Sequence, residues 1–384
     1  MLNMIEVADR LKQVEEYYFS KKLREVNFLK SQGRPIINLG IGSPDLDPPF
    51  KANVALEESL NDDGAHKYQN YQGLPELREA MANFYHENFK VHLSAQTEIL
   101  PLMGSKEGIM HISMAFLNKG DKILAPNPGY PTYSAVAGLL DAQTVYYDLE
   151  EDNNWLPNFT ALEKMDLERV KIMWVNYPHM PTGANAPHKF FDEIIAFGKR
   201  HSILIVNDNP YSFILNNNPK SILRYNNAKE VCLELNSLSK TFNMAGWRVG
   251  MVCGNYEFIQ AVLQVKSNMD SGMFYGIQKG AIEALNSSEM WFVSLNSVYE
   301  KRRQLIWELA TKLNCTYDED ASGLFVWAKL PPHFNSVEFA DLLLKEHSIF
   351  VAPGSVFGSL GEGYIRFSLC SGEVQIEEAL ARIK

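Results

Sequence analysis

Short runs of apolar residues alternate with helical patterns over the middle of the chain, from about residue 97 to residue 252. Such alternation is typical of mostly parallel strands that are covered by helices on both faces of a sheet. The first run contains Pro101, which cannot donate a hydrogen bond to a neighbouring strand. We therefore predict an α/β fold in which this strand lies at an edge of the sheet or is shorter than its apolar run.

The two ends of the chain carry different patterns. Apolar residues at helical spacing predict one amphipathic helix from about residue 5 to residue 30, namely Val7, Leu11, Val14 and Tyr18. After about residue 287, helical patterns and apolar runs are mixed in an order that favours a smaller α+β domain. We expect residues 46–286 to form a large domain, and residues 1–45 to join residues 287–384 in the small one.

Composition and charge exclude several classes of protein. The 384 residues carry a formal net charge of -10, so a protein that binds nucleic acid through a basic surface is not expected. No apolar stretch approaches the roughly 18 residues of a membrane span, and the N-terminal sequence shows no export signal. The four cysteines have no metal-ligand spacing, which favours reduced thiols. We expect a cytoplasmic protein that binds small molecules, with no metal.

Polar or glycine-rich sequences follow five of the predicted strands. Because ligands bind at the carboxyl ends of the strands in open α/β sheets, these sequences mark the expected site. They are Gly-Ser-Lys at 104–106, Pro-Asn-Pro-Gly-Tyr at 126–130, Asn-Tyr-Pro-His at 176–179, Asn-Asp-Asn-Pro-Tyr at 207–211 and Asn-Ser-Leu-Ser-Lys at 236–240.

Lys240 follows the last of these strands, in a loop of small and polar residues. Desolvation there would lower the pKa of the amine toward the neutral form that attacks an aldehyde, although a single lysine is usually a surface charge. The S-x-S/A-K pattern of Ser237 and Lys240, with Arg248 eight residues later, resembles the class I family of fold-type I aminotransferases. The resemblance covers essentially the whole chain.

This resemblance implies a pyridoxal 5'-phosphate cofactor, a large domain with a mostly parallel seven-stranded sheet, and a small α+β domain. It implies that Lys240 holds the cofactor as a Schiff base, while Ser237 and Arg248 bind its phosphate. Asp208 and Tyr211 match the family's D-x-x-Y pattern. By resemblance, Asp208 keeps the pyridine nitrogen protonated and Tyr211 donates a hydrogen bond to the ring hydroxyl oxygen. An N-cap or turn is the ordinary alternative for such an aspartate.

Further matches extend the cofactor site. Gly-Ser before a helix favours anions through free backbone N–H groups, and by resemblance Ser105 and Lys106 cradle the phosphate. Tyr130 matches the aromatic residue that stacks on the pyridine ring. Tyr68, or Tyr71 if the alignment shifts, resembles the tyrosine that reaches the phosphate of a neighbouring subunit, which implies a homodimer.

Arg366 matches the family's carboxylate-binding arginine, whose planar fork suits an α-carboxylate, and Gly42 would add a backbone N–H. One position departs from the pattern N-P-x-N-P-T/S-G. Met180 replaces the second asparagine, and it offers no hydrogen-bond donor to cofactor or substrate. We predict that Met180→Asn changes substrate affinity or the titration of the Schiff base.

The resemblance implies transamination by ping-pong chemistry, from a neutral or diaminopimelate-like amino acid to a 2-oxo acid, with 2-oxoglutarate as the expected acceptor. A lyase or synthase on the same scaffold is the alternative, because fold does not fix function. A regulator with an aminotransferase-like effector domain fits less well, since only about 40 residues precede the segment of Gly40 and Gly42 and the chain is acidic.

Overall fold

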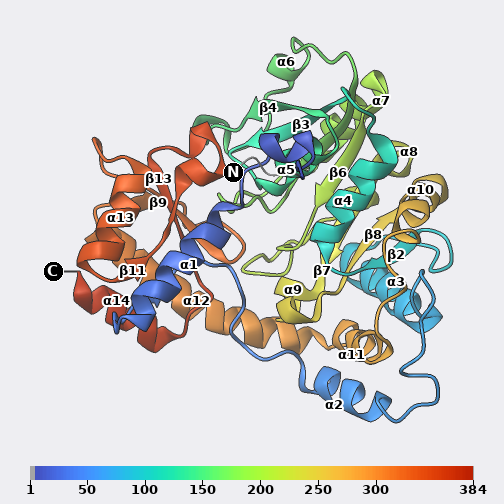
Figure 1. Ribbon diagram of the computed structural model, residues 1–384, viewed down its shortest axis with the longest axis horizontal. Helices are drawn as coiled ribbons and strands as arrows, with labels where there is room; N and C mark the ends of the chain where they lie inside the picture. Colours follow the sequence, from blue (N-terminus) through green and yellow to red (C-terminus); the bar gives the residue numbers. More distant parts are fainter. Residues whose placement is uncertain (1–4, 384) are drawn as a thin grey trace.

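A seven-stranded sheet forms the centre of the computed structural model, which describes residues 5–383 (Figure 1). Six strands are parallel to one another, and only β8 runs against its two neighbours. The strands, in their order across the sheet, are β2 (Ile99–Leu102), β8 (Gly250–Gly254), β7 (Cys232–Ser237), β6 (Leu204–Asp208), β5 (Val170–Val175), β3 (Lys122–Asn127) and β4 (Gln143–Asp148).

The expected α/β architecture is confirmed, and so is the position of Pro101. Strand β2 is an edge strand, where a missing backbone N–H leaves no unpaired partner on its open side. The five predicted strands are β2, β3, β5, β6 and β7. Strands β4 and β8 were not among them, because in β4 only Tyr147 is buried and the other residues of that strand lack a continuous apolar run.

Helices cover both faces of the sheet because alternate residues of each strand point to opposite sides. Ile172 and Trp174 of β5 belong to a core shared with α4, α5 and α10, whereas Met173 and Val175 belong to the core on the other face. The helices around the sheet are α2 (Phe50–Ser59), α3 (Pro75–Phe89), α4 (Ser105–Phe116), α5 (Thr132–Leu139), α6 (Phe159–Leu162), α7 (His188–His201), α8 (Ala228–Val231), α9 (Leu238–Thr241), α10 (Tyr256–Lys266) and α11 (Tyr275–Leu285).

A second group of elements, orange and red in Figure 1 except for the blue residues 37–38, forms two small sheets with their helices. All strands of the large sheet lie between residues 99 and 254, whereas those of the small sheets come from residues 37–38 and 316–368. These elements are β1 (Ile37–Asn38), β9 (Thr316–Tyr317), β10 (Phe325–Lys329), β11 (Ile349–Phe350), β12 (Ala352–Pro353), β13 (Tyr364–Ser368), α12 (Glu289–Lys312), α13 (Ser336–Glu346) and α14 (Glu373–Arg382). The domain boundaries near residues 46 and 286 stay a prediction.

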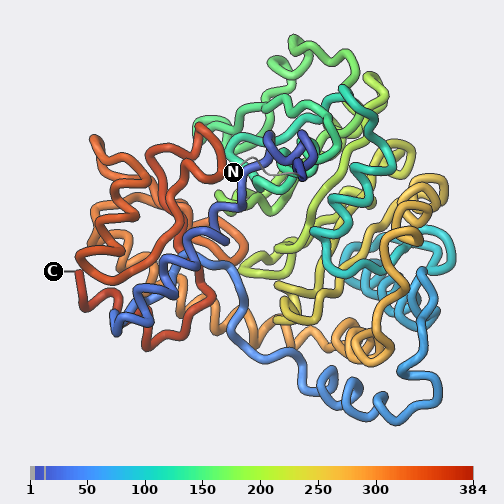
Figure 2. Tube along the Cα trace, viewed as in Figure 1, coloured from blue at the N-terminus to red at the C-terminus, as the bar shows by residue number. Residues whose placement is uncertain are grey.

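The single N-terminal helix expected over residues 5–30 is wrong. The structure has a short 3-10 helix, η1 (Asp9–Gln13), then an irregular segment, and then α1 (Tyr18–Ser31). Helix η1 lies against α5, whereas Lys22 of α1 pairs with Asp341 of α13 at 2.9 Å. The segment therefore crosses from the large sheet to the C-terminal elements (Figure 2), which one straight helix would not do.

Within residues 5–383, no helix combines the length and the apolar character that a bilayer crossing requires.

Candidate active site

A cavity of about 710 Å³ lies where the carboxyl ends of the parallel strands face the C-terminal elements and α1. Eleven of the twelve residues proposed from the sequence line it, so positions far apart in the chain meet at one place. They are Gly42, Ser105, Lys106, Tyr130, Met180, Asp208, Tyr211, Ser237, Lys240, Arg248 and Arg366. Tyr68 is the exception.

Lys240 lies on the short helix α9, one turn after β7 ends at Ser237. The Ser237 side chain accepts a hydrogen bond from the backbone N–H of Ser239 at 3.1 Å, which fixes the start of this helix. Lys240 Nζ donates to the backbone carbonyl of Gly42. Burial lowers the pKa of Lys240, and the nearby cations Arg366 and Arg248 lower it further, so the neutral amine is accessible at lower pH than for a surface lysine.

Asp208 is the last residue of β6, and its side chain is buried at the cavity wall. Oδ2 accepts a hydrogen bond from the Tyr133 hydroxyl at 3.0 Å, whereas Oδ1 has no hydrogen-bond partner within the described residues. Burial raises the pKa of Asp208 to about 7. One oxygen therefore holds the carboxylate in place, and the other is available to a donor on a ligand. The Asp208 side chain acts neither as an N-cap nor as a turn residue.

The first turn of α4 faces the cavity opposite Arg248. Gly104 precedes the helix with a φ of +86°. No side chain of residues 5–383 caps the helix N-terminus, so its first backbone N–H groups remain available for an anion. A Cβ atom on Gly104 would lie 2.2 Å from Arg248 Nη2. Glycine is thus favoured by the left-handed backbone conformation, and a side chain there would also displace the guanidinium of Arg248 from the start of the helix.

Arg366, in β13, is a buried cation with no carboxylate partner among residues 5–383. Its guanidinium carbon lies 3.8 Å from the ring centre of Phe325 and 4.7 Å from that of Phe357. Nη2 donates to the Gly40 carbonyl at 2.9 Å, and Nε has no acceptor within that range. Burial lowers the pKa of Arg366 to about 10. An anion that reaches this arginine would relieve the desolvation of its charge.

Met180 faces the site, as its place in the motif required. Its side chain is buried, and Sδ accepts a hydrogen bond from Arg366 Nη1 at 3.2 Å. The backbone N–H of Met180 donates to Asn176 Oδ1 at 2.7 Å, and Asn176 Nδ2 donates to the Asp208 carbonyl. A weak sulfur acceptor therefore contacts the arginine where the family pattern has an amide.

Tyr68 lies outside the cavity, with 90% of its surface exposed. Its segment packs against the loop after α10, since a Cβ on Gly272 would come within 2.5 Å of the Gln69 carbonyl. The alternative residue, Tyr71, is 43% exposed and also does not line the cavity. Neither tyrosine therefore contributes to the wall of the cavity in its own chain.

Several residues of the site were not found from the sequence. Asn176 lies in a motif that we quoted, and Tyr133 lies three residues beyond another, but no pattern separated them from core residues. Phe325 and Phe357 look like ordinary core positions in the sequence. The polar face of α1 is the largest omission, and its helical spacing was the signal that could have found it; the cavity-lining residues of that segment are Tyr17, Phe19, Ser20, Leu23, Arg24 and Asn27.

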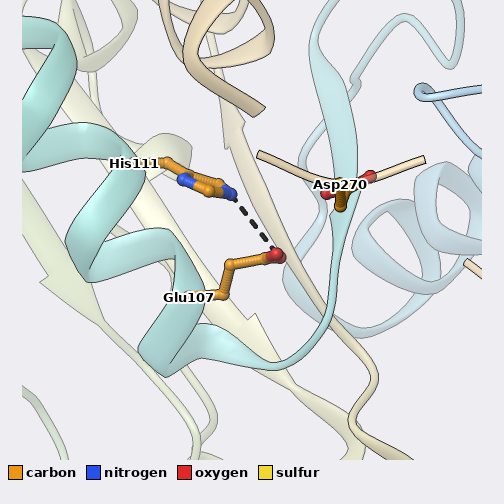
Figure 3. A group of neighbouring side chains, drawn as sticks. All are labelled: Glu107, His111 and Asp270. Atoms are coloured by element: carbon orange, nitrogen blue, oxygen red, sulfur yellow. Dashed lines mark ion pairs between the residues drawn. The ribbon is translucent and has the colours of Figure 1, made fainter. Parts of the chain in front are cut away.

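A polar cluster lies behind the first turn of α4 (Figure 3). His111 Nε2 is 3.3 Å from Glu107 Oε1, one turn earlier on the same helix, and Asp270 approaches from the loop after α10. Lys266 Nζ pairs with Asp270 Oδ2 at 2.5 Å, and Glu107 Oε2 accepts from the Met103 N–H at 2.6 Å. The ammonium of Lys266 supplies the counter-charge, and the cluster ties the loop before α4 to the loop after α10.

Comparison with known proteins places this site in a family. The sequence model described as Aminotransferase class I and II matches residues 34–383. The chain belongs to this family. The aminotransferase is 39% identical over 381 residues to an LL-diaminopimelate aminotransferase of Dehalococcoides mccartyi, covering 99% of this chain and 98% of that one. It is 38% identical over 383 residues to the protein of the same name from Aquifex aeolicus, with 99% of both chains covered.

Solved structures agree with this assignment of the aminotransferase. Substrate-bound BacF from Bacillus subtilis matches with a TM-score of 0.93 and 35% identity, covering 99% of this chain and 97% of that one. A single mutant of Thermus thermophilus aspartate aminotransferase matches with a TM-score of 0.91 and 25% identity, and 99% of both chains is covered. The fold-type I architecture and the transaminase class expected from the sequence are confirmed.

Proposed function

We propose that this aminotransferase uses pyridoxal 5'-phosphate to move the amino group of a diaminopimelate-like amino acid to a 2-oxo acid, with 2-oxoglutarate as acceptor. The names of the full-length relatives support the donor. The observation that carries the proposal is the meeting of Lys240, Asp208 and Arg366 in one cavity, where Asp208 Oδ1 has no hydrogen-bond partner and the Arg366 cation no carboxylate partner among the described residues.

The residues of the cavity fit the cofactor. Asp208 Oδ1 is a buried acceptor without a donor, and a protonated pyridine nitrogen would supply one. The free N–H groups at the start of α4, together with Ser237 and Arg248, form an anion site for its phosphate. Tyr130 and Tyr211 line the same cavity, where they would stack on the ring and donate to its oxygen. When bound, the cofactor acts as an electron sink for the bonds at the substrate α-carbon.

Residues of the protein bind the α-carboxylate of the substrate and remove its α-proton. Arg366 binds the α-carboxylate with its fork, and the Gly42 N–H adds a donor beside it. A Cβ on Gly42 would lie 2.3 Å from the Phe325 ring, so a larger residue would displace the phenyl group that packs on Arg366. Lys240 Nζ, with its lowered pKa, removes the α-proton of the oriented amino acid as a general base.

A homodimer with shared sites is part of this proposal. Tyr68 is 90% exposed and does not line the cavity of its own chain, which supports a role at the phosphate of a neighbouring subunit. The four free, buried cysteines support a reducing, cytoplasmic compartment. A molar mass in solution of twice that of the chain would agree with the dimer, and a monomer that is active would contradict it.

The direct test is a titration of the purified, cofactor-loaded protein with LL-diaminopimelate, followed by visible absorbance. We expect the amino acid to convert the aldehyde form of the cofactor to its aminated form, with one 2-oxo acid released per site and no free ammonia. 2-Oxoglutarate should reverse the change, as ping-pong chemistry requires. Release of ammonia would identify a lyase instead. A protein that does not take up the cofactor would contradict the proposal.

Met180→Asn is expected to lower KM for the amino donor by about fivefold, because an added amide N–H contributes roughly 1 kcal/mol through one more hydrogen bond. Steady-state kinetics with the donor varied at saturating acceptor measures the change. Met180→Leu is the matched control, since it keeps the apolar volume and removes only the sulfur contact with Arg366. An unchanged KM in Met180→Asn would show that this position does not contact the substrate.

A further inference from the structure

One face of α1 forms a wall of the active-site cavity. Ser20, Leu23, Arg24 and Asn27 all line it, and their spacing of three, four and seven residues places them on one side of the helix. Figure 1 shows α1 in blue, crossing the molecule beside the red C-terminal elements. The wall begins with Phe19, whose ring centre is 5.4 Å from the guanidinium carbon of Arg366.

Arg24 of this wall forms an ion pair with Glu16, which precedes α1 and is not itself among the residues that line the cavity. Arg24 Nη1 and Nη2 donate to the two carboxylate oxygens of Glu16 at 2.5 and 2.7 Å. Ser20 Oγ joins both residues, since it donates to Glu16 at 2.8 Å and accepts from Arg24 Nη1 at 3.2 Å. The Arg24 guanidinium holds the pKa of Glu16 well below its usual range, so both charges persist at neutral pH.

The pair leaves one edge of the guanidinium open. A guanidinium has five N–H donors. Glu16 and Ser20 take three of them, both on Nη1 and one on Nη2. The remaining Nη2 donor and Nε–H lie on the same edge, and nothing in residues 5–383 accepts from Nε. The side chains of Arg24 and Glu16 are 64% and 43% exposed, so a solute in the cavity can reach them.

We propose that Arg24 and Glu16 form a distal subsite for the second amino acid end of the donor, Arg24 binding its carboxylate and Glu16 its ammonium. This rests on the proposed function, because the donor must be a bis-amino acid of the diaminopimelate type. A preformed pair of opposite charges complements a zwitterion better than it complements a lone carboxylate, for which Glu16 would be repulsive. Arg366 and Arg24 thus bind the two ends of one molecule.

The rise of α1 sets the separation of the two backbone positions that carry the proposed contacts, and that separation is close to the length of the donor. Phe19, beside Arg366, and Arg24 are five residues apart, which corresponds to about 7.5 Å along a helix that rises 1.5 Å per residue. The terminal carboxyl carbons of an extended seven-carbon chain are separated by six C–C bonds, or roughly 7 to 8 Å. Leu23 lies between Ser20 and Arg24 on the same face, next to the path of the methylene groups.

Three donors with the same carbon chain test the subsite in the holoenzyme. LL-Diaminopimelate carries both distal charges, L-2-aminopimelate only the carboxylate, and L-2-aminoheptanoate neither. Glu16→Gln is expected to lower kcat/KM about tenfold for diaminopimelate, to raise it for aminopimelate, whose lone distal carboxylate Glu16 repels, and to leave aminoheptanoate unchanged within twofold. Arg24→Met is expected to lower it about tenfold for diaminopimelate and for aminopimelate, and to leave aminoheptanoate unchanged within twofold.

A matched control lies on the same segment. Lys12 Nζ and Asp9 Oδ1 pair at 2.6 Å, both side chains are exposed, and neither residue lines the cavity, so Asp9→Asn and Lys12→Gln should leave all three values unchanged. If Glu16→Gln and Arg24→Met affect the three donors equally, or not at all, while the wild-type enzyme turns over diaminopimelate, the subsite is wrong and the proposed function stands. A wild-type enzyme that accepts other amino acids but not diaminopimelate overturns both.

Discussion

Lys240→Ala is expected to lower kcat/KM by about 10⁴-fold, since a general base alone contributes roughly 10²- to 10⁴-fold and this lysine also holds the cofactor. The geometry behind this expectation is the position of Lys240 in the cavity. Lys240 follows β7 directly, and both burial and the arginines at positions 248 and 366 lower its pKa. Steady-state kinetics and the absorbance titration with the amino donor together measure the loss.

The control for this variant must separate lost chemistry from lost folding. A small primary amine added to Lys240→Ala should restore part of the α-proton removal, which a misfolded protein could not do. Lys189→Ala is the matched surface variant, because Lys189 is 83% exposed and, in the part of the chain that the structure describes, pairs only with Glu193. A Lys240→Ala enzyme that keeps more than a tenth of the wild-type activity would contradict the assigned role.

Asp208→Asn is expected to lower kcat by about 10³-fold, because a neutral amide cannot hold a positive charge on the ring nitrogen that it faces. The same change should stabilise the cofactor-free protein at neutral pH. Burial raises the pKa of Asp208 to about 7. Relative to an ordinary value of about 4, this corresponds to roughly 4 kcal/mol of unfavourable charge burial.

The sign of the pH dependence follows from linkage. A carboxyl whose pKa is higher in the folded state binds its proton more tightly there, so its contribution to stability is present below about pH 4 and is lost between about pH 4 and 7. The free energy of unfolding of cofactor-free Asp208→Asn, relative to that of the wild type, should therefore increase over this pH range. Above the range, the difference between the two proteins should stay constant. Urea unfolding at a series of pH values measures the difference.

Glu234→Gln is the matched control for the catalytic effect. Glu234 is a buried carboxyl on the neighbouring strand β7, and burial also raises its pKa. Its oxygens accept from Asn207, Tyr85 and the Ile222 N–H, and it does not line the cavity. This variant should keep kcat within a few fold of the wild type. A comparable loss of kcat in both variants would mean that the effect of Asp208 is structural.

Local patterns in the sequence account for much of the fold. The apolar runs of β3, β5, β6 and β7 are buried on both faces, so they are continuous and easy to find. Strand β4 was not predicted, because one of its faces is partly exposed. The N-terminal helix was predicted too long, because the apolar spacing of residues 7–18 continues across a bend. Only the contacts with α5 and α13 explain that bend.

The sequence by itself determined the chemistry that is local in the chain: a lysine after a strand, an aspartate at the end of another, and a glycine-serine turn before a helix. Those groups depend on short-range backbone geometry, so a motif is enough to identify them. Only the tertiary structure decided which side chains face them. The rings around Arg366, the sulfur of Met180 against its guanidinium, and Arg24 at the cavity wall come from segments that are far apart in the chain. Their contacts exist because packing of the C-terminal elements and α1 against the large sheet brings these side chains together, and no periodicity along the chain encodes that packing.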